Sequence, residues 1–303
     1  FNPNNGQLSY SWYEGQLING STYCDVWWIN IPNGVPANSN ITIYMYVGNS
    51  SDNYYPLCYP YIGTSPQVIS GYDNGQKVFI AYGYFNNTFD GWNGSGGPTA
   101  TSNGIEMLTP QGAVTYILPP NNWNIPKMPL IVEEAWYHTS GADANTISLF
   151  GNTSQQIYAR NIGSTLGGGT PASSLSTFVQ FEYYVGGPAT MLKSAVTDQY
   201  LNYTSFPTSA GTVYSYLLVN SSYAQTGYYY YNSNQVWAPL TLLNTYNINN
   251  NGYTYYNLNY NPFQYGTLEI GAGTGGVTSY QYVEWVIARA YPPNGVMPSI
   301  YIS

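Results

Sequence analysis

Short runs of alternating apolar and polar residues, separated by clusters of glycine, proline, asparagine and serine, constrain the fold of this 303-residue chain most strongly. The run Ile41–Val47 alternates isoleucine, methionine and valine with threonine and tyrosine, the period of two that is typical of a half-buried β-strand. No segment of the sequence combines a helical apolar stripe with helix caps. The pattern therefore predicts an all-β fold, a β-sandwich, jelly roll or barrel, with helix in less than about a tenth of the chain. The other β-rich runs are Cys24–Ile31, Lys77–Tyr84, Ala113–Leu118, Leu130–Trp136, Thr177–Val185, Val213–Asn220, Thr254–Tyr260 and Gln281–Ala290.

The chain carries few ionisable side chains. Asp, Glu, Lys and Arg make up 6% of the residues, against about 25% in an average soluble domain. With five Lys and Arg residues and a formal net charge of −8, the chain has no basic surface for nucleic acid, so we expect no nucleic-acid partner. Acid unfolding arises mainly from carboxylates that are ionised in the native state. Because the chain has only 13 Asp and Glu residues, its composition favours a protein that works in an acidic extracellular medium.

Cysteine usage and glycosylation signals point to a secreted chain. Cys24 and Cys58 are the only cysteines and permit one disulfide, with two buried free thiols as the alternative. No apolar run approaches the roughly 18–20 residues of a membrane span, and the chain begins at Phe1 as a mature N-terminus would after removal of a signal peptide. We therefore expect an extracellular or cell-surface location. The Asn-x-Ser/Thr acceptors for N-glycosylation, whose asparagines also serve as ordinary turn formers, are Asn19, Asn40, Asn49, Asn86, Asn93, Asn152, Asn202 and Asn220.

Several segments resemble known surface proteins. The sequences WWINIP at Trp27–Pro32 and NITIYMYVGN at Asn40–Asn49 are similar to the uncharacterised β module of archaeal and bacterial surface proteins. The segments Gly71–Phe79, Phe85–Trp92 and Tyr282–Pro298 resemble the concanavalin A-like region that follows this module. The resemblance implies a secreted or cell-surface protein with two β domains.

The implied domains are an N-terminal β module over residues 1–70 and a concanavalin A-like β-sandwich over residues 71–303. The chain starts partway into the usual module, so we expect its sheet to lack an edge strand that a neighbouring copy supplies. In this respect the chain is similar to subunits of archaeal threads, which are glycosylated, pilus-like adhesive filaments. The donor strand is expected within residues 1–18 or in the tail Val296–Ser303, unless both ends pair within their own subunit.

The alternative function is carbohydrate binding by a monomeric, lectin-like protein at the cell surface, because the concanavalin A-like fold hosts such proteins. Trp92, Trp123 and Trp237 lie in polar contexts where an exposed indole stacks on a sugar ring, although core packing explains tryptophans equally well. The expected partners are therefore copies of the same chain, N-linked glycans, and polysaccharide or other cell surfaces.

The sequence offers no convincing catalytic site, so we expect neither enzymatic activity nor a cofactor. A retaining glycosidase needs two carboxyl groups about 5–5.5 Å apart. Glu133 and Glu134 are adjacent and therefore point to opposite faces of a strand. His138 is the only histidine and lies at the end of a predicted strand without a catalytic signature.

The sequence carries only a weak signal for calcium binding and names no metal ligand. Loops that contain Asp52, Asp73, Asp90 and Asp143 offer calcium ligands, but none has the spacing of a calcium-binding loop. Arg289, near the end of the last predicted strand, is expected to pair with a carboxylate or to cap carbonyl groups.

Overall fold

The chain forms two compact units, one made of residues 1–80 and 232–240 and the other of residues 81–231 and 241–303. Almost all regular structure in the described part of the chain is β-strand, and the only α-helix there is α3 (Gly75–Val78). The boundary that the sequence predicts between residues 70 and 71 lies outside the described residues. The computed structural model describes residues 10–19, 22–32, 34–36, 38–44, 73–110, 114–120, 129–138, 144–150, 178–184, 189–194, 211–219, 223–230, 253–257, 267–273 and 278–291.

The first unit contains an antiparallel hairpin of β1 (Ser11–Asn19) and β2 (Thr22–Ile29). Trp12 of β1 is buried, and its ring meets the ring of Phe79 edge to face at 5.1 Å. The Trp12 indole N–H donates a hydrogen bond to Asp73 Oδ1 at 3.1 Å. Residues 11–18, expected as part of a strand donated to another copy, pair instead with β2 of their own chain. Residues 1–9 and the tail Val296–Ser303 lie outside the described residues.

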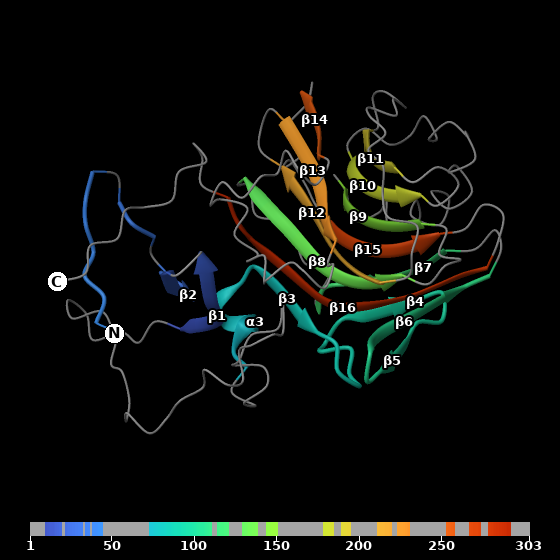
Figure 1. Cartoon of the computed structure of the whole chain (residues 1–303), viewed down its shortest axis with the longest axis horizontal. Helices are drawn as coiled ribbons and strands as arrows, with labels where there is room; N and C mark the ends of the chain where they lie inside the picture. The colour runs from blue at the N-terminus through green and yellow to red at the C-terminus, as the bar shows by residue number, and fades with distance from the viewer. Residues whose placement is uncertain are drawn as a thin grey trace. The chain divides into compact units, whose positions relative to one another are not determined.

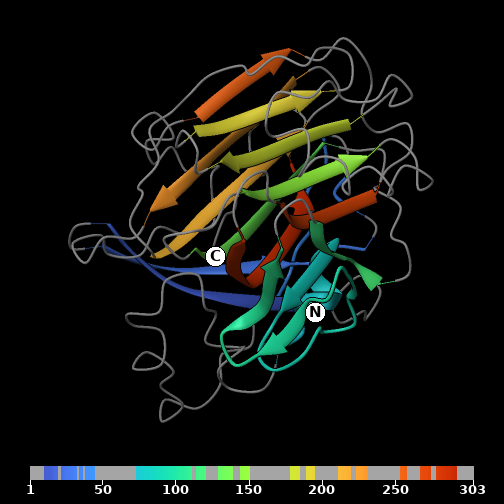
Figure 2. The ribbon, with the colours of Figure 1, turned by 90° about the vertical axis from the view of Figure 1, so that its right-hand side faces the viewer.

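The second unit contains two antiparallel sheets, whose strands Figures 1 and 2 display from two directions. The six-stranded sheet has the order β11 (Ala189–Ser194), β10 (Phe178–Tyr184), β9 (Ala144–Phe150), β15 (Thr267–Gly273), β7 (Val114–Leu118), β4 (Asn93–Ser95). The eight-stranded sheet has the order β14 (Tyr253–Asn257), β13 (Tyr223–Tyr230), β12 (Gly211–Val219), β8 (Leu130–His138), β16 (Ser279–Ala290), β6 (Gly104–Thr109), β5 (Thr99–Thr101), and β3 (Ala81–Tyr84) also pairs with β16.

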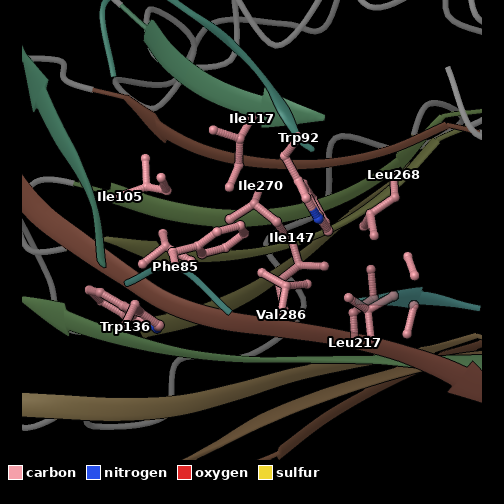
Figure 3. Close-up of a cluster of buried hydrophobic side chains, with 14 of the residues drawn as sticks. Phe85, Trp92, Ile105, Ile117, Trp136, Ile147, Leu217, Leu268, Ile270 and Val286 are labelled. Atoms are coloured by element: carbon pink, nitrogen blue, oxygen red, sulfur yellow. The ribbon is translucent and has the colours of Figure 1, made fainter. Parts of the chain in front are cut away.

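The main hydrophobic core lies between these two sheets (Figure 3). Alternate residues of β8, including Val132 and Trp136, point into it, because successive side chains of a strand lie on opposite faces. The facing sheet contributes Ile147 from β9 and Ile270 from β15, and these side chains meet those of β8, β12 and β16 in the middle of the sandwich. The predicted fold class, an all-β sandwich, is confirmed.

Two strand predictions were wrong in part. Within Lys77–Tyr84, residues 77–78 belong to α3, and the strand begins only at Ala81. Asp73 favours the helical turn because its Oδ1 accepts a hydrogen bond from the Gly75 N–H at 3.0 Å. Residues 41–44 of the alternating run Ile41–Val47 belong to no sheet, and its other residues lie outside the described part. Alternation alone does not make a strand, because the backbone also needs a hydrogen-bonded neighbour.

Candidate functional site

Trp92, one of the three candidate sugar-stacking residues, lies in the core, which is the alternative that the sequence left open (Figure 3). Only 3% of its surface is exposed, and its ring meets Phe85 edge to face at 5.6 Å. Its indole N–H donates a hydrogen bond to the carbonyl oxygen of Tyr82 at 3.0 Å. Trp92 is therefore a packing residue, and Trp123 and Trp237 lie outside the described residues.

Three tyrosines gather on the outer face of the eight-stranded sheet, which is turned away from the sandwich core. Tyr280 and Tyr282 lie on β16, and Tyr137 lies opposite Tyr282 on β8. The ring centroids of Tyr280 and Tyr282 are 5.1 Å apart, and those of Tyr137 and Tyr282 are 6.4 Å apart. On the other side, β6 places Glu106 opposite Tyr282 and Leu108 opposite Tyr280. We call these five residues the tyrosine face.

The tyrosine face is open to solvent. Tyr137 is 37% exposed and Leu108 is 49% exposed, while the other three residues are half-buried. Farther along the same outer face, Ile131 and Tyr216 are buried in a small second cluster. The eight-stranded sheet therefore has one covered and one accessible part, and the aromatic rings with a carboxyl group lie on the accessible part.

A β-bulge fixes which side chains of β16 reach this face. The register between β16 and β8 shifts between Val283 and Trp285, so Val283 and Val286 both point into the core. Before the bulge, Tyr280 and Tyr282 alternate with the buried Gln281 and Val283 and so point outward. Because of the bulge, β16 contributes side chains to the core both before and after the register shift. Its first residues still place Tyr280 and Tyr282 on the outer face of the sheet.

The hydroxyl groups of Tyr280 and Tyr282 form a hydrogen bond with each other. This bond is the largest cause that raises the pKa of Tyr282 to about 12, and burial and the nearby charge of Glu106 act in the same direction. Tyr282 therefore remains a neutral phenol at every physiological pH. The tyrosine face offers hydroxyl groups, a carboxyl group and aromatic ring surface side by side.

The two adjacent glutamates of β8 have opposite environments, as the sequence predicts. Glu133 accepts two hydrogen bonds from the Arg289 guanidinium, at 3.0 Å from Nε and 3.1 Å from Nη2, which confirms the expected pairing of Arg289 with a carboxylate. Glu134 is completely buried beside Asn145 of β9. Neither oxygen of its carboxyl group has a hydrogen-bond partner at normal distance and angle. Burial raises the pKa of Glu134 well above its usual value, and the Asn145 side chain lowers it only in part.

The other polar residues singled out in the sequence do not converge on a site. His138 pairs in backbone register with Gln281 and Gly211. The Asp90 carboxylate accepts a hydrogen bond from the Tyr84 N–H at 3.2 Å, and Asp73 binds the N–H groups of Trp12 and Gly75. No group of three or more histidine, cysteine, aspartate or glutamate residues suited to a metal ion occurs among the described residues. Asp52 and Asp143 lie outside them.

The modification sites stay predictions. Cys24 lies on β2, and Cys58 lies outside the described residues, so the disulfide stays a prediction. The residues Asn40, Asn86 and Asn93 are exposed, as glycosylation requires, and Asn19 ends β1. The remaining acceptors outside the described part are Asn49, Asn152, Asn202 and Asn220.

Sequence comparison finds a relative of unknown function. Uncharacterised protein 562 of Sulfolobus islandicus rod-shaped virus 1 is 30% identical over 318 residues, which cover 96% of this chain and 49% of the viral protein. The chain therefore spans about half the length of the curated relative that it matches. No protein-family model matches the chain.

Several solved structures of lectins resemble the chain at low sequence identity. The Lotus tetragonolobus seed lectin is 12% identical with a TM-score of 0.49, covering 69% of this chain and 98% of the lectin. Peanut lectin with a nine-residue peptide is 13% identical with a TM-score of 0.47, covering 68% of this chain and 96% of the lectin. Lectin II from Ulex europaeus is 8% identical with a TM-score of 0.46, covering 68% of this chain and 96% of the lectin. Likeness at this level concerns the β-sandwich alone.

In the described part of the chain, no helix is both long enough and apolar enough to cross a bilayer.

Proposed function

We propose that the chain is a carbohydrate-binding protein that works outside the cell and holds its ligand on the tyrosine face. The observation that carries this proposal is the alignment of three tyrosine rings with one carboxyl group on the open part of the eight-stranded sheet. The exposed acceptor asparagines and the low content of charged residues support the extracellular location.

The chemistry of the tyrosine face suits a saccharide. A pyranose ring has an apolar face of C–H groups and a rim of hydroxyl groups, so it is recognised by surfaces that combine flat apolar area with hydrogen-bonding groups. Tyrosine supplies both, and its two side-chain torsions lose little entropy on binding. Tyr137 and Tyr282 offer ring surface, and Glu106 beside Tyr282 offers an acceptor for sugar hydroxyl groups.

The proposed activity is binding without catalysis. Glu133 is held by Arg289, and Glu134 is buried in the core, so neither is available to form a pair of catalytic carboxyl groups at the surface. Of the tyrosine face, Glu106 is the one carboxyl-bearing member. A filament assembled by strand donation has less support, because residues 11–18 pair within their own chain.

The experiment that tests the proposal is a glycan array probed with the whole chain, followed by titration of the best-bound oligosaccharide. We expect Tyr282→Ala to weaken binding by about tenfold or more, since a ring buried against a ligand contributes about 1.5 kcal/mol or more. Tyr44→Ala is the matched control, because Tyr44 is 52% exposed and belongs to the first unit. Equal loss in both variants, or no saccharide bound by the wild-type chain, would contradict the proposal.

A further inference from the structure

We infer that the tyrosine face accepts uncharged or amino-bearing saccharides and excludes acidic ones. This inference rests on the proposed function and adds the chemical class of the ligand. It follows from the distribution of charge on and around the eight-stranded sheet.

Among the described strands of the eight-stranded sheet, no lysine or arginine lies beside the carboxyl group of the tyrosine face. This carboxyl group belongs to Glu106, which lies directly opposite Tyr282. Besides His138 at the end of β8, the strands of the eight-stranded sheet contain one basic residue, Arg289. Its guanidinium is buried and bonded to Glu133, so it is committed to the covered part of the outer face.

An acidic saccharide meets two obstacles at this face. Its carboxylate or sulfate groups would approach the Glu106 carboxylate at short range without a described cation to offset the repulsion. At longer range, the formal net charge of −8 at pH 7 disfavours the approach of any polyanion. Both effects select against uronic acids and sulfated sugars.

Neutral and amino-bearing sugars meet the opposite situation. Sugar hydroxyl groups donate hydrogen bonds to the Glu106 carboxylate, and hydrogen bonds to an ionised acceptor are stronger than those between neutral groups. An ammonium substituent gains attraction from Glu106 and from the faces of the tyrosine rings, which carry partial negative charge. A single carboxylate therefore discriminates between the two ligand classes.

The test compares dextran and mannan, each unmodified, aminated and sulfated at one chain length, by biolayer interferometry at pH 7. We expect the unmodified and aminated forms of at least one polysaccharide to bind at least tenfold more tightly than its sulfated form. Sulfated forms that bind as tightly as the unmodified forms would overturn this inference and leave the proposed function intact. Binding to none of the six polymers and to no glycan of the array would overturn both.

A charge-neutralising variant separates the local effect from the effect of net charge. The measured quantity is the ratio of the affinity for the unmodified polysaccharide to the affinity for its sulfated form. We expect Glu106→Gln to lower this ratio at least threefold. Glu14→Gln changes the net charge equally but lies in the first unit, and we expect it to leave the ratio unchanged. Equal ratios in both variants would contradict a role for Glu106, and thermal melting of each variant verifies that it is folded.

Discussion

Gly104 allows two strands of the eight-stranded sheet to approach each other more closely than any residue with a side chain permits. Its φ angle is +119°, and a Cβ atom at this position would lie 2.3 Å from the carbonyl oxygen of Val283. Val283 borders the β-bulge of β16, immediately after Tyr282. The glycine thus permits the backbone geometry that holds β16 beside β6 at the tyrosine face.

We expect Gly104→Ala to lower the free energy of unfolding by about 3 kcal/mol or more, because it combines an unfavourable φ with a backbone clash. Gly97→Ala is the control: Gly97 has a φ of +85° but open space around it, so only strain of about 1 kcal/mol is expected. Chemical denaturation of both variants measures the difference. If Gly104→Ala and Gly97→Ala lowered the free energy of unfolding equally, the close approach of Val283 to Gly104 would not contribute to the effect.

At the scale of whole elements, β8 joins two different polar environments. Glu133 is bonded to Arg289 of β16 on the outer face, and Glu134 enters the core toward Asn145 of β9 in the opposite sheet. A carboxyl group that is fully desolvated favours its neutral form. The sandwich is therefore most stable when Glu134 is protonated.

This buried carboxyl group gives a defined pH dependence. The pKa of Glu134 is raised in the folded state, so its contribution to stability is complete below the unfolded value of about 4.5 and is lost as pH rises toward the folded pKa. Over that interval we expect the free energy of unfolding to fall by up to about 1.4 kcal/mol for each pH unit. Glu134→Gln keeps the shape and removes the charge, so this variant should lose the decline and be more stable than wild type at pH 7.

The measurement is a series of urea unfolding curves between pH 3 and pH 8. Glu106→Gln is the matched control, since the same substitution at the half-buried tyrosine face should leave the decline in place. An unchanged decline in Glu134→Gln would mean that other groups cause it.

Local sequence pattern predicted individual strands better than it predicted the site. The β-rich composition of β8 and β16 was sufficient to identify both strands, and the geometry of a strand placed Glu133 and Glu134 on opposite faces. The tyrosine face depends on the order β8, β16, β6, which joins segments more than a hundred residues apart and is not encoded in any local pattern. The alternation of Tyr280 and Tyr282 with Gln281 indicates that both tyrosines lie on one face of a strand. The polar neighbours of Trp92 in the sequence suggested an exposed indole, but Trp92 is buried.

The whole molecule combines few charges with a core that favours a protonated glutamate. Both features reduce the loss of stability in acid, because few carboxylates must take up protons on unfolding and Glu134 is protonated in the folded state already. They support the hypothesis of an acidic extracellular medium, which stays a prediction. A melting temperature that falls sharply between pH 6 and pH 2.5 would contradict it.

The central claim is that saccharide covers the tyrosine face, and hydroxyl-radical footprinting with mass spectrometry tests it most directly. The measurement compares the oxidation rate of each aromatic side chain with and without the tightest-binding saccharide of the array. We expect Tyr137, Tyr280 and Tyr282 to be protected, while Trp27 and Tyr44, which are exposed in the first unit, keep their rates. Protection of Trp27 or Tyr44 with unchanged oxidation of the three tyrosines would contradict the account.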